Sequence, residues 1–139
     1  MRKISHLIVH CTATPYGREV TVNQIDAWHR QRGFACIGYH YVIGLDGCIN
    51  LGRDIATAGA HCLHFNQYSI GIAYVGGLDA SGKPVDTRTA AQRDALRRLL
   101  THLKQQFPGA RIVGHNDLAN KACPCFNAAE EYNDIHSNA

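Results

Sequence analysis

The stretch Leu7-Ile8-Val9-His10 is a short apolar run that ends on a histidine, and Arg111-Ile112-Val113-Gly114-His115 has the same character near the other end of the chain. Short apolar runs of this kind predict buried β-strands. Each histidine then lies at the carboxyl end of its strand, a common location for functional sites on open α/β sheets. If the two strands are neighbours in the sheet, His10 and His115 come together.

Helical patterns alternate with the strand patterns, which predicts an α/β fold. Capping-box sequences begin a helix at Thr21, which ends at Gly33, and a second helix at Thr89. The second helix carries apolar residues at helical spacing, so one face packs on the sheet. Further strands are predicted over 39–43, 48–51 and 69–75, with an Asp46-Gly47 hairpin turn, a loop over 78–86 and a short helix within 128–135.

Composition narrows the range of partners. The chain has 139 residues, enough for one domain with a core, and its 18% charged residues are ordinary for a globular protein. A net charge of +3 is too weak to indicate nucleic-acid binding, and Arg93, Arg97 and Arg98 form a solvated helix face. No run of residues is long and apolar enough to span a membrane. We therefore predict neither a nucleic-acid partner nor a membrane span.

The six cysteines and the N-terminus indicate a reducing compartment during synthesis. The cysteines are irregularly spaced, and residues 1–6 lead into an apolar run too short for a signal peptide. We expect synthesis in the cytoplasm without a signal peptide, with mostly reduced thiols.

The segment Gly114–Pro124 adds a thiol, Cys123, and a cation, Lys121, to the second histidine. His10, His115 and Cys123 are three ligands that zinc accepts, and three protein ligands leave a fourth position for water, as in catalytic sites. Each residue alone is more often structural, and no His-Glu-x-x-His motif is present. Spacing leaves Cys125 as an alternative to Cys123 for the sulfur ligand.

Two further residues have the chemistry for amide hydrolysis. Lys121 can stabilise the oxyanion that forms when water attacks a carbonyl, and the Tyr39 phenol can relay a proton. His40 alternates with Tyr39 and is expected in the core, whereas His61 lies in a loop, where functional residues are common.

The chain resembles the zinc-dependent N-acetylmuramoyl-L-alanine amidases of type 2, which are related to peptidoglycan recognition proteins, and is most similar to the amidase-type phage lysozymes. The resemblance covers nearly the whole chain up to about Phe126, and its main matching stretches are Ile8–Thr14, Gly38–Ile43, Gly59–His61, Asn66–Gly71, Val75–Gly77, Gly114–Asp117 and Lys121–Pro124.

The resemblance implies a single domain over residues 1–139, with a core of about 4–127 and a tail of 128–139, built on a central mixed β-sheet flanked by helices. It implies that His10, His115 and Cys123 bind zinc, that Tyr39 and Lys121 are catalytic, and that His61 contacts substrate. The implied reaction cleaves the amide between N-acetylmuramic acid and L-alanine in peptidoglycan, and we expect a monomer.

The chain departs from the family pattern at two places, and two other functions are possible. Cys125 replaces a small residue, and the stretch 61–65 is individual to this chain, so the specificity of the chain for the stem peptide is open. The alternatives are a non-catalytic muropeptide-binding module, against which the retained Cys123 argues, and a cytosolic amidase that recycles muropeptides. A phage enzyme without a signal peptide would reach the cell wall through a holin-type route.

Overall fold

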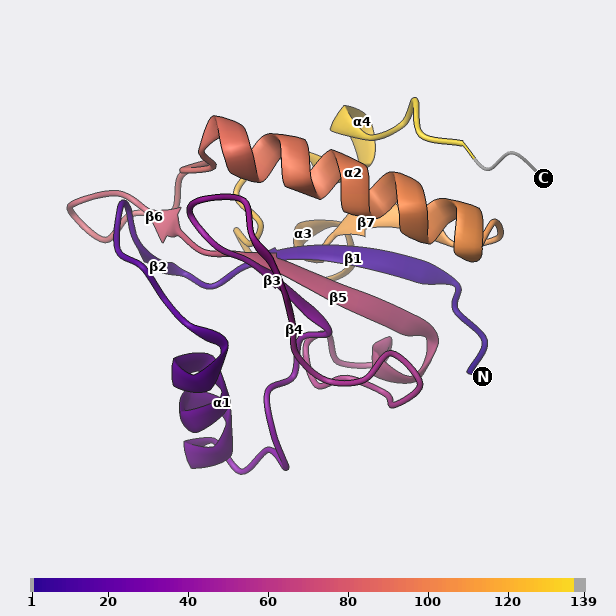
Figure 1. The fold of residues 1–139 in the computed structure, drawn as a ribbon, viewed down its shortest axis with the longest axis horizontal. Helices are drawn as coiled ribbons and strands as arrows, with labels where there is room; N and C mark the ends of the chain where they lie inside the picture. The colour runs from indigo at the N-terminus through magenta and orange to yellow at the C-terminus, as the bar shows by residue number, and fades with distance from the viewer. Residues whose placement is uncertain (1, 137–139) are drawn as a thin grey trace.

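The computed structural model describes residues 2–136 and shows an α/β domain in which one mixed sheet separates two groups of helices (Figure 1). The long helix α2 lies along one side of the sheet with α4 beside it, and α1 lies on the other side. The predicted α/β class and the mixed sheet flanked by helices are therefore confirmed. Residues 137–139 of the predicted tail lie outside the described residues.

Seven strands and four α-helices make up the described fold. The strands are β1 (His6–Cys11), β2 (Thr14–Pro15), β3 (Tyr41–Ile43), β4 (Ile49–Leu51), β5 (Ser69–Tyr74), β6 (Gly77–Leu78) and β7 (Arg111–Gly114). The helices are α1 (Val22–Gln31), α2 (Ala90–Gln106), α3 (His115–Leu118) and α4 (Ala128–Glu131), with a 3-10 turn over Asn66–Tyr68.

Strand β1 lies between two parallel neighbours in a sheet of order β4-β3-β5-β1-β7. Successive side chains of a strand point to opposite faces. On β1, Leu7, Val9 and Cys11 therefore join the core under α2, whereas Ile8 packs in a separate cluster on the other face. His10 follows the alternation of Ile8. The pairing of β1 with β7 confirms that the two histidine-bearing strands are neighbours.

The two long helices begin where the sequence predicts. The Thr21 and Thr89 hydroxyls each accept a hydrogen bond from the backbone N–H three residues on, and the side-chain oxygen of the glutamine there accepts one from the threonine N–H. These capping boxes satisfy backbone donors that a helix start leaves unpaired. Helix α2 then covers the sheet with a row of buried leucines, which are Leu96, Leu99, Leu100 and Leu103.

The structure differs from the predicted elements in several places, among them the short helix α3, which the sequence did not predict. Strands β2 and β6 pair in a second small sheet, where the sequence indicated only a loop after Leu78. Tyr39 and His40 precede β3 instead of starting it. They are still held as an extension of the sheet, because His40 N–H donates to the Gly71 carbonyl at 2.9 Å and Gly52 N–H donates to the His40 carbonyl at 2.9 Å.

A buried arginine fastens α4 to the body of the domain. The Arg88 side chain is fully buried and bonds Asp86, Glu131 and the Tyr132 hydroxyl at 2.7–3.0 Å. Its guanidinium also lies over the Phe126 ring, 3.4 Å from the ring centroid. A buried charge needs partners of this kind to offset its lost hydration. The contact anchors the chain just after the segment that carries Lys121 and Cys123.

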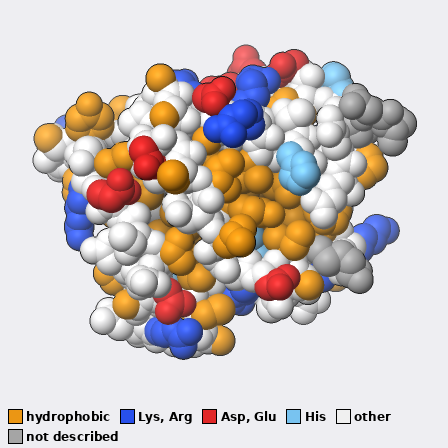
Figure 2. Space-filling model, viewed as in Figure 1, with side chains coloured by type: hydrophobic (Ala, Val, Ile, Leu, Met, Phe, Trp, Pro, Cys, Tyr) orange, Lys and Arg blue, Asp and Glu red, His pale blue; other side chains and the backbone are white. Residues whose placement is uncertain are grey.

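Surface charge is mixed. In Figure 2 the basic and acidic side chains on the visible face lie next to one another and do not form one basic patch. The side chains of Arg93, Arg97 and Arg98 are 44–62% exposed, and each pairs with an aspartate. This supports a solvated helix face for the three arginines. Among the described helices, none is long and apolar enough to cross a membrane.

The leucine row of α2 gives a stability prediction. Leu100 is fully buried, so Leu100→Ala should lower the free energy of unfolding by about 2–5 kcal/mol through lost transfer energy and the cavity left behind. Leu63, which is 77% exposed, is the control, and its alanine variant should change stability by less than about 0.5 kcal/mol. Urea denaturation measures both, and equal losses would contradict the assigned core.

Candidate metal centre

His10, His115 and Cys123 meet at the carboxyl ends of β1 and β7. One ligand atom from each residue lies within 4.8 Å of the others. Among residues 2–136, these three side chains form the group that could hold a metal ion. His10 is the penultimate residue of β1, and His115 directly follows β7. The parallel pairing of these strands is what brings the two imidazoles together, with ring centroids 4.7 Å apart.

Of the two candidate sulfur ligands, the structure places Cys123 with His10 and His115. Its Sγ lies 3.7 Å from His10 Nδ1 and accepts a hydrogen bond from the Cys11 N–H at 3.2 Å. Cys125 points elsewhere, with its Sγ 3.4 Å from the Gly77 carbonyl and 4.0 Å from the Cys11 Sγ. All six cysteines are unbridged in the described structure.

The protonation states in this cluster suit a metal cation. Burial lowers the pKa of His10 far below its ordinary value and also lowers that of His115, to which the Lys121 charge contributes. Hydrogen bonds from the side chain and backbone of Cys11 lower the pKa of the Cys123 thiol. Neutral imidazoles and a thiol biased toward thiolate are the forms that bind zinc.

The distance between two of the candidate ligand atoms also fits a zinc ion. With zinc bonds of about 2.3 Å to sulfur and 2.0–2.1 Å to nitrogen, tetrahedral geometry sets the ligand atoms about 3.6 Å apart. The observed 3.7 Å between Cys123 Sγ and His10 Nδ1 matches this separation. Zinc would therefore be held by His10 through Nδ1, together with His115 and Cys123.

The three ligands border a groove of about 750 Å³ on the α1 side of the sheet. Lys121 and Tyr39 also line this groove, so the structure brings the two predicted catalytic residues to the predicted metal ligands. Its other walls come from α1 and the adjoining loops and include Trp28, Arg32, Phe34 and Leu63. The groove is large enough for a ligand of drug size or more.

Tyr39 is fixed beside the metal ligands from both sides. Its ring centroid is 5.3 Å from that of His10 and 5.3 Å from that of His29. His29, on α1, accepts a hydrogen bond from the Gly38 N–H at 2.8 Å, which anchors the residue before Tyr39. Burial is the largest cause that raises the pKa of Tyr39, and the nearby Cys123 and Cys11 thiols raise it further. The phenol therefore stays protonated and can donate a hydrogen bond.

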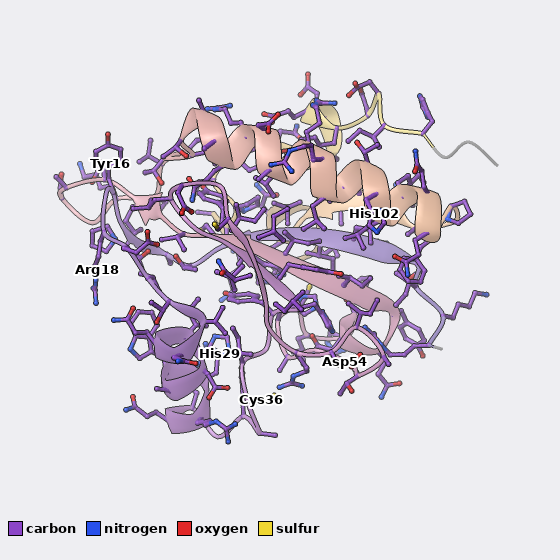
Figure 3. The ribbon with its side chains drawn as sticks, viewed as in Figure 1. Tyr16, Arg18, His29, Cys36, Asp54 and His102 are labelled. Atoms are coloured by element: carbon purple, nitrogen blue, oxygen red, sulfur yellow. The ribbon has the colours of Figure 1, made fainter. Side chains whose placement is uncertain are left out.

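The remaining histidines divide between the core, the groove and the surface. His40 is buried, as predicted, and His29 packs against Tyr39. His61 lines the groove and lies against His10, with 2.8 Å between His61 Nδ1 and His10 Nε2. His102 is exposed on α2, across the sheet from His29 (Figure 3). Ser69 bonds the His61 ring and Asn66 bonds its backbone N–H. The sequence did not identify either residue as functional, because neither stands at a spacing that marks a site.

Comparison with known proteins finds one family and several relatives that match most of the chain. The family described as N-acetylmuramoyl-L-alanine amidase matches residues 1–126. The endolysin of Klebsiella phage KP32 is 43% identical over 125 residues, covering 90% of this chain and 83% of the relative. The endolysin of Escherichia phage T7 is 41% identical over 120 residues, covering 86% of this chain and 80% of the relative.

A solved structure of similar fold is the N-acetylmuramoyl-L-alanine amidase LysC from Clostridium intestinale. It superposes with a TM-score of 0.78 at 28% identity, covering 94% of this chain and 82% of that one.

The buried histidines predict an acid-sensitive fold in the metal-free protein. Burial lowers the pKa of His40 to about 4, below the roughly 6.5 of an unfolded histidine. The unfolded chain therefore takes up this proton first, so the free energy of unfolding should fall between about pH 6.5 and pH 4, by roughly 3 kcal/mol from His40. Burial lowers the pKa of His61 to about 3, which extends the fall.

Chemical denaturation across this pH range, with chelator present, tests the prediction. His40→Gln should flatten part of the slope, whereas His102→Gln, on the exposed face of α2, should leave it unchanged. A slope that His40→Gln does not alter would contradict a neutral, buried His40.

Proposed function

The chain belongs to the N-acetylmuramoyl-L-alanine amidase family and is an amidase of peptidoglycan, and we propose that its activity depends on zinc held by His10, His115 and Cys123. The observation that carries the proposal is the convergence of two imidazoles and a thiol from distant parts of the chain within 4.8 Å. A structural zinc site would more usually close with a fourth protein ligand.

When bound, zinc acts as a Lewis acid toward a carbonyl oxygen and lowers the pKa of a coordinated water to about 7. His10 is almost fully buried and orients the site from within the sheet, whereas His115 and Cys123 are partly exposed toward the groove. We therefore expect the scissile amide to bind on the groove side of the ligands.

Lys121 and Tyr39 are the two residues that we propose act on the substrate. The exposed Lys121 lines the groove beside His115 and can direct its ammonium at the oxygen that becomes negative as the amide carbonyl is attacked. The protonated Tyr39 phenol can hydrogen-bond the same carbonyl or pass a proton to the leaving amine. His61 borders the same groove, where the resemblance assigns it to substrate contact.

The bond that we propose is cleaved joins N-acetylmuramic acid to the L-alanine of the stem peptide. Two of the relatives are phage endolysins, which supports a role in lysis. We further propose release to the cell wall by a holin-type route and action as a monomer. The rates of hydrolysis of intact sacculi and of soluble anhydro-muropeptides distinguish this role from cytosolic recycling of muropeptides. Only a lysis enzyme should prefer sacculi.

Zinc dependence gives the first test. A chelator should abolish release of muropeptides from purified sacculi, and added zinc should restore it, with new L-alanine amino termini identified by mass spectrometry. Cys123→Ser should abolish hydrolysis because it removes the sulfur ligand, whereas Cys125→Ser should retain it. Unchanged hydrolysis by Cys123→Ser or after chelation would overturn the assigned metal site. Muropeptide binding without any hydrolysis by the wild type would favour a binding module.

The catalytic pair gives a second test. Lys121→Met should lower kcat by about 10²–10³-fold, since one oxyanion donor is lost while most of the side-chain volume stays. Tyr39→Phe should lower kcat by about 10²-fold or more because only the hydroxyl is removed. Zinc content measured by atomic emission should stay at the wild-type level in both variants. An unchanged kcat in either variant would remove that residue from the proposed mechanism.

A further inference from the structure

Behind the metal ligands, a row of hydrogen bonds runs from His10 into the backbone. His10 Nε2 lies 2.8 Å from His61 Nδ1, and His61 Nε2 lies 3.3 Å from the Ser69 hydroxyl. The Ser69 hydroxyl donates to the Phe65 carbonyl at 2.8 Å. We infer that His61 is a positioning residue, which accepts the Nε2 proton of His10 and so fixes the tautomer and orientation of that metal ligand. The inference rests on the proposed zinc site.

The direction of these hydrogen bonds follows from the metal. His10 faces Cys123 through Nδ1, so Nδ1 must be free of a proton to bind zinc, and the His10 proton is then on Nε2. His61 Nδ1 must accept this proton, which leaves the His61 proton on Nε2, where the Ser69 oxygen accepts it. The row ends at a carbonyl, which can only accept. Every member therefore has one consistent role, with both imidazoles neutral.

The His61 ring is held in place by space that glycine leaves open. A Cβ at Gly71 would lie 2.7 Å from the His61 ring, and one at Gly59 would lie 2.6 Å from it, both too close for a real contact. Gly71 lies on β5 beside Ile8 of β1, one strand from the metal ligand. The ring stands almost perpendicular to that of His10, at 88°, and its centroid is 4.8 Å away.

The loop that carries His61 is also tied down. The Asn66 side-chain oxygen accepts hydrogen bonds from the backbone N–H groups of His61 and Cys62 at 2.8 and 2.9 Å. Both ring nitrogens of His61 are hydrogen-bonded and its backbone is anchored, so its ring can restrict the orientation of the His10 ring. Partners that orient a metal-binding histidine typically change metal affinity or activity by about 10–100-fold when they are removed.

The test compares two amides that differ only in where they place their oxygen. The amide oxygen of Asn is bonded to Cγ, as Nδ1 is in histidine. His61→Asn can therefore present an acceptor to His10 Nε2. The amide of Gln is one methylene further out and cannot take the same position. His61→Leu removes the acceptor altogether. His102→Asn and His102→Leu, on the exposed face of α2, are the matched controls.

The readout is the zinc dissociation constant, measured by competition with a chromophoric chelator. His61→Leu and His61→Gln should bind zinc about 10–100-fold more weakly than the wild type, whereas His61→Asn should recover most of the loss. The visible spectrum of the cobalt(II)-substituted protein should change with Leu and Gln and stay close to the wild type with Asn. Thermal unfolding checks that each variant is folded, and if His61→Leu does not fold, the Asn and Gln pair decides.

The outcomes separate this inference from the zinc proposal on which it rests. Wild-type protein that binds no zinc would overturn both. Wild-type zinc affinity in folded His61→Gln or His61→Leu would overturn the positioning role alone. A raised KM with unchanged zinc affinity would instead assign His61 to substrate contact and overturn the inference in the same way.

Discussion

The register of β1 between β5 and β7 is the constraint on which the rest of the structure depends. Alternation along this strand sends Leu7, Val9 and Cys11 into the core under α2 and leaves His10 on the opposite face, beside the groove. A shift by one residue would exchange the two faces, burying the imidazole under the leucines and exposing apolar side chains in the groove. The apolar core and the metal site are therefore specified by the same hydrogen-bond ladder, and neither can be correct without the other.

The sequence predicted the parts of this arrangement that depend on local pattern. The helix starts at Thr21 and Thr89 were predictable because a capping box is complete within four residues. The short pairing of β2 with β6 was not, since two residues give no period to detect. The resemblance to a family selected Cys123, but spacing alone left Cys125 as an alternative. The choice depends on where each side chain points, which only the folded loop determines.

The contact between His61 and His10 shows a further limit of sequence reasoning. His61 was marked as functional by its place in a loop and by the resemblance, but its hydrogen bond to His10 joins residues 51 positions apart. Ser69 carries no signal of its own, because a serine at the start of a strand is unremarkable in composition and spacing. The network joins side chains from two neighbouring strands and one loop, and it becomes visible only when the strands are placed in register and the loop is folded over them.

Gly71 shows how this architecture limits gains in stability. Glycine in the interior of a strand is destabilising by roughly 0.5–1 kcal/mol relative to alanine, so a selection for thermal resistance would favour a side chain here. Any such side chain would displace the imidazole that lies 2.7 Å from the missing Cβ. Selection for a firmer sheet and selection for metal retention therefore oppose each other at this one backbone position. A thermostable relative would have to gain its stability elsewhere and keep the glycine.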